Sequence, residues 1–564
     1  MSEYQPNLEE AAELAEINRL PLSRRLGYYA KKSGPGWLQA AITLGGGSLA
    51  SALFLGVILN YHLMWLQPLA MILGVVMLCA ISYVTLSSQR RPFESVKTFV
   101  SPVLAWGWLL AAMLANMVWC LPQFALGTGA VQQNLIPSLD GSKSATWAVG
   151  AALLVSAALA VRAYDSGGRG VRVFEGILKA MVGIVVVSFF LVVGRLTVSG
   201  SLDWGLILSG FLPDVSLLKN PSPVIGAAIA ETGANAATWT SLIAGDQRDI
   251  IIAAFGTAVG INMTFLLPYS MLRKGWTREH RGLAVMDLGV GLFVPFLLAT
   301  SCIVIAAASQ FHGKSEDILS ADGTVIAAKA GGYNAVADRF VKARFSGEIA
   351  ALPEADRAAK VAEWREALPL SDRKVAAMLV SRKDSDLAKS LSALAGEGVG
   401  RIVFGVGVLG MALSTIIILM LINGFCLCEA FNRAGDRKLH FLGSLVPGLI
   451  GVCFPLIWND QSRAKLAVPT SVIGASLLPI AYFTFLLLMN SPRLLGEAMP
   501  RGGKRFVLNA LMIFATSVAT FGSVWALRGK EVDGIPVGTI GLVVLVALFL
   551  LGLFGFLSKN RRKA

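Results

Sequence analysis

The chain has 564 residues, of which 55% are hydrophobic and only 15% are charged, and its mean hydropathy is +0.65. Soluble domains carry about 25% charged residues, so this composition excludes an ordinary soluble protein. A net charge of +14 would suggest nucleic acid as a partner of a soluble protein. Here, however, the Lys and Arg residues lie in short segments between apolar runs, where they set membrane orientation. We therefore expect a lipid bilayer as partner, and neither nucleic acid nor a nucleotide, since the phosphate-binding pattern GxxxxGK[ST] is absent.

Apolar runs recur along the chain, and each is long enough to cross ~30 Å of hydrocarbon as a helix. Backbone groups in lipid must be satisfied within the segment, which favours helices. The sequence thus predicts an all-α integral membrane protein with about twelve transmembrane helices. The expected spans are 36–59, 62–88, 102–126, 145–163, 173–197, 250–272, 284–310, 402–430, 440–458, 466–490, 506–527 and 536–558.

Basic residues orient these spans. With twelve spans and the N-terminus inside, most loop Lys and Arg fall on the cytoplasmic side, which predicts a multi-pass protein of the cell (inner) membrane with both termini cytoplasmic. A thirteenth span at 222–245 would move every later basic loop outside, so this segment is expected to be an external hairpin or surface helix. Residues 312–398 are Ala-rich, near charge-neutral and helically periodic, and predict a helical cap on the outer face.

Two spans are interrupted in matching ways. The first contains three consecutive glycines after Leu44, each costing about 1 kcal/mol against Ala in a helix, and the sixth contains Gly256–Thr264 with Pro268 one turn later. Such paired interruptions indicate a midplane binding site in transporters, although small residues also allow close helix packing. The expected substrate-binding residues are Thr43, Gly45, Gly46, Gly47, Ser48, Gly260, Asn262, Met263, Thr264 and, in the tenth span, Ser471.

No acidic residue falls at mid-depth in any expected span. Glu175, Asp287 and Glu429 lie near cytoplasmic helix ends, where capping or snorkelling explains them. A metal site is therefore undefined, with Ser48, Asn262 and Met263 as its weak candidates. We expect no catalytic residue, no cofactor and no enzymatic activity.

Several short motifs, in order from about 34 to 500, resemble the NRAMP (natural resistance-associated macrophage protein) family of proton-coupled divalent-metal transporters. They are Gly34-Pro35-Gly36-Trp37-Leu38, Phe174-Glu175, Gly210-Phe211-Leu212-Pro213, Gly424-Phe425, Glu429-Ala430-Phe431, Pro479, and Asn490 to Gly496. The resemblance implies a leucine-transporter-type fold, with two inverted five-helix repeats plus two extra C-terminal spans.

On that basis the expected organisation is a cytoplasmic segment 1–35, a first repeat 36–197, an external loop or hairpin 198–249, a second repeat 250–490 that contains the insertion 312–398, and two extra spans with a basic tail in 491–564.

The chain departs from the family at its metal-site motifs. The Asp-Pro-Gly-Asn motif of the first span falls on Gly45 to Ser48, and the Met-Pro-His-Asn motif of the sixth falls on about Asn262 to Phe265. The tenth-span glutamine falls on Ser471, and the third-span acids fall around Leu121 and Phe124. The resemblance implies a secondary transporter, or symporter, that moves divalent cations of the Mn, Fe or Mg class by alternating access. The alternatives are a transporter of a small organic solute and a membrane sensor or scaffold that does not transport.

Overall fold

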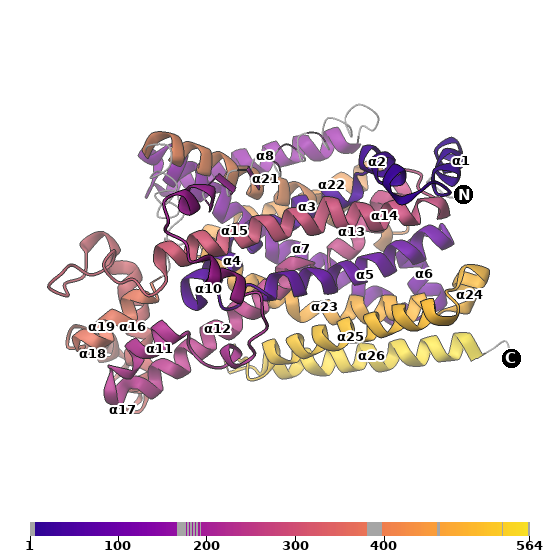
Figure 1. The fold of residues 1–564 in the computed structure, drawn as a ribbon. Coiled ribbons are helices and arrows are strands. Elements are labelled where there is room, and N and C mark those ends of the chain that lie inside the picture. The colour runs from indigo at the N-terminus through magenta and orange to yellow at the C-terminus, as the bar shows by residue number, and fades with distance from the viewer. Residues whose placement is uncertain are drawn as a thin grey trace.

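The computed structural model describes residues 6–165, 193–380, 397–458, 463–532 and 534–561, with a few positions between 176 and 191. Within these ranges the regular secondary structure is helical, apart from isolated antiparallel bridges between Leu319 and Val325 and between Val532 and Ile535. Long helices run along one common direction and form a bundle (Figure 1). This arrangement satisfies the backbone of each span internally, as a bilayer requires.

The described residues contain ten helices that are long and apolar enough to cross a membrane, or eleven with one bent pair. The bent pair is α3 (Pro35–Thr43) and α4 (Gly46–Leu59). The others are α5 (Leu66–Ser88), α7 (Pro102–Gly129), α8 (Lys143–Asp165), α12 (Ala236–Ala258) with α13 (Met263–Arg273), α14 (Arg281–Leu288) with α15 (Val294–Phe311), α21 (Glu397–Ala430), α22 (Arg437–Val452), α23 (Ala467–Met489), α25 (Gly502–Leu527) and α26 (Val537–Arg561). They match the predicted spans with two exceptions: most of the fifth, 173–197, lies outside the described residues, and the sixth begins earlier than predicted.

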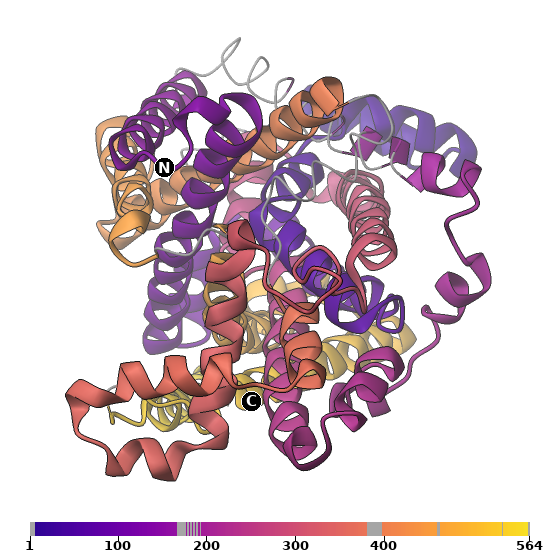
Figure 2. The same ribbon diagram turned by 90° about the vertical axis from the view of Figure 1, so that its left-hand side faces the viewer.

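The two termini lie at one end of the bundle and the insertion lies at the other (Figure 1). The N-terminal segment forms α1 (Leu8–Ile17) and α2 (Leu22–Lys32), and the N–H of Asn7 donates to the carbonyl of Gly275, beyond α13. The insertion forms α16 (Ala330–Arg344), α17 (Ser346–Ala351), α18 (Glu354–Glu366) and α19 (Leu370–Met378). Figure 2 views the molecule from this end, with the insertion helices in front of the bundle. The cap predicted from the sequence is therefore helical in its described part; residues 381–396 lie outside it.

The sixth span differs from its prediction because its helix starts fourteen residues earlier. The segment 222–245, expected outside, divides into the short helix α11 (Pro223–Ala230) and the first turns of α12. Polar side chains of this region bond to the cap, and the Asn235 amide donates to Asp372 at 3.1 Å. Asp246 forms two hydrogen bonds to the Arg339 guanidinium, at 2.9 and 2.6 Å, and the Trp239 indole donates to Asp372 at 2.7 Å. Satisfied polar groups cost little in a protein interior, so the helix extends under the cap.

Candidate functional site

The first and sixth spans are both broken near their middles. The helices α3 and α4 meet at an angle of 52°, with Leu44 and Gly45 in the turn between them. A side chain at Gly45 would place its Cβ 2.3 Å from the Thr415 hydroxyl, so close approach requires glycine there. The helix α12 ends at Ala258, Val259 is extended, and α13 begins at Met263.

The two breaks lie side by side and contact each other within the bundle. The Thr43 hydroxyl lies 3.4 Å from the Ala258 carbonyl and 3.3 Å from the Met263 sulfur. The Ser48 hydroxyl donates to the Thr43 carbonyl and lies 3.4 Å from the Thr257 carbonyl. The irregular backbone of both spans therefore meets at one buried place, as expected where such backbone lines a cavity.

A small cavity lies between the breaks. Its volume is about 30 Å³, which gives room for about one or two water-sized particles. Its lining comes from α3, α4, α7, α12, α13 and α21, and consists of Ile42, Thr43, Gly47, Ser48, Trp119, Gln123, Thr257, Gly260, Asn262, Met263, Thr415 and Leu419. No carboxylate, imidazole or thiol is among these residues, and the described part of the chain has no group of three or more His, Cys, Asp or Glu that could hold a metal ion.

The N-terminal and C-terminal helix ends at this cavity differ in how well their backbone groups are hydrogen-bonded. At the N-terminal ends, the N–H of Gly46 donates to the Gln123 amide oxygen at 2.9 Å, and the N–H of Met263 donates to the Asn262 amide oxygen at 2.9 Å. At the C-terminal end of α12, the carbonyls of Thr257 and Ala258 accept from hydroxyls only at 3.4 Å. Helix N-termini attract anions and C-termini attract cations. One N–H at each N-terminal end thus already bonds a neutral side chain of the protein, whereas the cation-attracting carbonyls at the end of α12 are bonded weakly.

The ten residues predicted from the sequence fall into two groups. Thr43, Gly47, Ser48, Gly260, Asn262 and Met263 line the cavity. The other four lie beside it. Gly45 and Gly46 form the turn and the first residue of α4, and the Thr264 hydroxyl accepts from the Trp108 indole at 2.7 Å. Ser471 is fully buried, and its hydroxyl has no hydrogen-bond partner among the described residues.

Three polar lining residues, Gln123, Thr257 and Thr415, are absent from the predicted binding residues. Thr257 lies within the interrupted run of the sixth span, but the residues chosen there lie in the break or after it. Thr415 lies in the middle of α21, where Ser414 and Thr415 are adjacent polar residues in an apolar run. Both of their hydroxyls bond the Ala41 carbonyl of the first span, at 3.2 and 3.3 Å. The adjacent hydroxyl residues Ser414 and Thr415, in the middle of an apolar span, were the sequence pattern that could have predicted Thr415 as a lining residue.

A second, polar cavity of about 390 Å³ lies at the end of the bundle that carries the termini. Its wall includes an ion-paired group in which Asp165 lies 2.9 Å from the His440 ring and 3.8 Å from Arg273. Glu429 also lines it, buried against Arg91 at 3.3 Å. Glu429, for which capping or snorkelling was expected, is thus ion-paired near the end of α21; Glu175 lies outside the described residues.

A bundle of membrane-length helices with two broken spans around a buried cavity is the architecture of a membrane transporter. The family model described as natural resistance-associated macrophage protein-like matches residues 36–332 and 375–525. The chain therefore belongs to the NRAMP family, a family of multi-pass membrane transporters and not of enzymes.

Solved structures support the same fold. A manganese transporter of Eremococcus coleocola, in complex with an aromatic bis-isothiourea substituted compound, aligns with a TM-score of 0.61 at 15% identity, over 96% of this chain and 97% of that one. Two mutants of that transporter align with TM-scores of 0.62 at 12% and 13% identity, over 96% of each chain. A search of the curated proteins found no match. The leucine-transporter-type fold predicted from the sequence is confirmed.

Proposed function

We propose that this chain carries a divalent metal cation across the membrane by alternating access, through the cavity between its two broken spans. The observation that supports this proposal is the difference in hydrogen bonding between the N-terminal and C-terminal helix ends. The N–H groups that would hold an anionic substrate already bond Gln123 and Asn262, while the carbonyls of Thr257 and Ala258 accept only at 3.4 Å. A cation gains more from such a site than an anion does.

The proposed ligands are neutral. They are the hydroxyls of Thr43 and Ser48, the carbonyls of Thr257 and Ala258, and the sulfur of Met263. Without an anionic ligand the site loses most of its Coulombic attraction for a divalent ion, so we expect an affinity for Mn²⁺ no better than millimolar, about −4 kcal/mol. Hard cations such as Mg²⁺ accept oxygen ligands of this kind.

The size of the cavity favours transport of a metal cation over transport of an organic solute. A volume of about 30 Å³ admits a cation with at most one or two waters, and a solute of many heavy atoms exceeds it. We propose that the ion sheds most of its hydration shell here. Since no carboxylate lines the cavity, the proposed cycle does not include proton exchange at the site.

Uptake by purified protein in liposomes tests the function. We expect concentration-dependent entry of Mn²⁺ or Mg²⁺ that each ion inhibits for the other, and no inhibition by alanine or leucine. Thr43→Val should reduce uptake several-fold, because it removes a cavity hydroxyl and keeps the side-chain shape. Thr484→Val is the matched control, since that buried threonine on α23 bonds only the Ile480 carbonyl of its own helix. Uptake of an amino acid, or no uptake of any cation, would reject the proposal.

We further propose that both termini are cytoplasmic and that the cap is external, in the cell membrane, with domain boundaries as predicted above. Basic residues gathered on the terminal side support this orientation. In a chain whose six cysteines are replaced, Gly331→Cys should react with an impermeant maleimide in intact cells, and Arg278→Cys should react only after the membrane is opened. The reverse pattern would invert the topology.

A further inference from the structure

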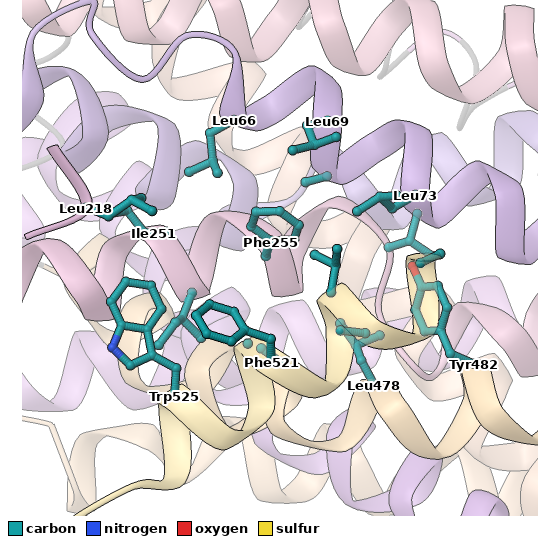
Figure 3. Close-up of a pocket in the computed structure, with 18 of the residues that line it drawn as sticks. Leu66, Leu69, Leu73, Leu218, Ile251, Phe255, Leu478, Tyr482, Phe521 and Trp525 are labelled. Carbon is teal, nitrogen blue, oxygen red and sulfur yellow. The ribbon is translucent and has the colours of Figure 1, made fainter. Parts of the chain in front are cut away.

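An apolar cavity of about 190 Å³ lies between α5, α12, α23 and α25 (Figure 3). Its wall is made of aliphatic and aromatic side chains, among them Leu69, Leu73, Ile251, Phe255, Leu478 and Phe521. Apolar cavities of about 150 Å³ stay dry and take up small apolar molecules. This cavity is therefore suited to hydrocarbon and unsuited to water or ions.

The cavity is elongated across half of a bilayer. On α12 its lining runs from Ile251 to Val259, which is about 12 Å of helix rise and close to the ~15 Å of one leaflet. Trp65, just before the start of α5, and Trp525, near the end of α25, both line the cavity, and Trp525 lies at the end of the cavity near Leu218 and Ile251 (Figure 3). Tryptophan at the end of a span typically lies at the membrane–water interface, so the long axis of the cavity runs from the interface to the midplane.

The outer rim carries positive charge and an unused hydrogen-bond donor. Arg248 precedes Ile251 by one turn of α12, and Lys530 follows α25; both pair with the single carboxylate of Asp249, at 3.3 and 3.1 Å. Two cations on one anion leave a net positive rim. The indole N–H of Trp65 is buried and finds no acceptor among the described residues, although an unsatisfied buried donor is costly.

We propose that this cavity binds one acyl chain of an anionic phospholipid from the leaflet on the side of the cap. The hydrocarbon fills the space between α12 and α25, the phosphate binds at Arg248 and Lys530, and an ester or phosphate oxygen accepts the Trp65 N–H. The apolar cavity, the basic rim and the Trp65 N–H would each bind a different part of one phospholipid. The acyl chain, the phosphate and the ester oxygens lie in a matching order along the membrane normal. A neutral hydrocarbon would leave the rim charge and the indole unused.

The inner end of the bound chain contacts the transport site indirectly. Val259 is the extended residue of the sixth-span break, it lines the apolar cavity, and the next residue, Gly260, lines the cavity between the breaks. Val259 also packs tightly on α5, where a Cβ added to Gly74 would lie 2.2 Å from its side chain. The lipid therefore contacts the sixth-span break through Val259.

The experiment uses phosphatidylglycerol with a photoactivatable diazirine in the half of the acyl chain nearer the headgroup, in phosphatidylcholine liposomes containing the full chain. Mass spectrometry of the irradiated protein should find labelling concentrated at 251–259 and 515–525. Gly522→Leu should lower this labelling about tenfold, because Gly522 lines the cavity and a Cβ there meets no atom within 4 Å, so the new side chain enters open space. Gly503→Leu on the same helix is the control, since a Cβ there also meets no atom and the position is outside the cavity.

Headgroup selection is read from the same assay. Labelling by the phosphatidylglycerol probe should exceed that by a phosphatidylcholine probe, and Arg248→Gln with Lys530→Gln should remove the difference. Labelling spread evenly over the exposed faces of α25 and α26 and unchanged in Gly522→Leu would reject the site. Equal labelling by the two probes in the unmodified protein would reject the anionic headgroup. Neither readout depends on transport, so this inference and the proposed function fail separately.

Discussion

The carboxylate of Asp287 on α14 accepts a hydrogen bond of 2.6 Å from the backbone N–H of Gly36 at the start of α3. It accepts a second bond, of 3.1 Å, from the N–H of Gly34. The backbones are also close, since a Cβ on Gly36 would lie 2.2 Å from the Asp287 carbonyl oxygen. An acidic side chain of the seventh span therefore caps α3, the first half of the broken first span, and anchors the segment that leads to the cavity.

Removing this cap should weaken the protein measurably. Asp287→Ala loses two charge-assisted hydrogen bonds in a buried place, which costs about 2–3 kcal/mol, and should lower the thermal unfolding temperature in detergent. Asp287→Asn keeps one acceptor oxygen, so it loses one of the two hydrogen bonds and the charge at the helix N-terminus, and should cost about 1–2 kcal/mol. Glu316→Ala, at an exposed position, is the control. Equal unfolding temperatures for all three variants would show that the cap contributes nothing to stability.

Restoring the family's acid in the first span needs a second change. A side chain at Gly45 collides with the Thr415 hydroxyl at 2.3 Å, so Gly45→Asp alone should fold poorly, as overpacking costs about 1–3 kcal/mol. Gly45→Asp with Thr415→Ala removes that hydroxyl and gives the cavity its anionic ligand. Calorimetry should then find Mn²⁺ binding at least about tenfold tighter than in Thr415→Ala. Micromolar binding to the unmodified protein would defeat the argument that the absent acid limits affinity.

The sulfur of Met263 lies 3.3 Å from both the Thr43 hydroxyl and the Gly260 N–H. Met263→Leu keeps the side-chain volume, and such exchanges usually cost less than 1.5 kcal/mol of stability. We expect uptake of the softer ion Cd²⁺ to fall several-fold and uptake of Mg²⁺ to change by less than about twofold, because Mg²⁺ prefers oxygen ligands. An equal loss for both ions would mean that Met263 acts through packing and not as a ligand.

Acidification should loosen the outer end of the first span. His312, just after α15, lies 2.9 Å from the Val57 carbonyl of α4 and 3.3 Å from the Ser222 hydroxyl. Burial lowers the pKa of His312 below its usual 6.5; the Val57 carbonyl raises this pKa and the neighbouring His62 lowers it. The unfolded chain thus binds the proton more readily, so this contribution to stability is present above about pH 6.5 and is lost as pH falls.

Hydrogen exchange at residues 57–60 tests this expectation. Exchange protection should be lower at about pH 5.5 than at about pH 7.5 after correction for the intrinsic rate. His312→Gln should flatten the difference. A pH dependence that is unchanged in His312→Gln would assign it to another group.

Much of the fold was predictable because membrane helices carry their own signal. Long apolar runs were enough for most of the spans that the structure describes, and three adjacent glycines were enough for the first break. The start of α12 was not predictable in this way. The polar groups of Trp239 and Asp246 are satisfied by hydrogen bonds to Asp372 and Arg339 of the cap. A contact between residues about a hundred positions apart leaves no local pattern.

The site shows the same division. Residues at the breaks could be named from glycine and polar spacing, but the lining also includes Thr415, which the eighth span supplies across the bundle. The choice of Thr264 followed its closeness to the break in sequence. The Trp108 indole instead holds its hydroxyl outside the cavity lining, since one step along a helix turns a side chain by about 100°.

The cap and the cavity lie at opposite ends of one rod. The helix α12 has 23 residues and is therefore about 35 Å long, with Trp239 stacked on Phe340 of the cap near its start and Ala258 beside Thr43 at its finish. A lever of this length turns a tilt of about 3° at the cap into a displacement of about 2 Å at the cavity, more than half the length of the bonds that join the two breaks. A rigid antibody fragment bound to α16 would thus prevent α12 from tilting. It would hold the end of α12 at the cavity in place without itself entering the membrane.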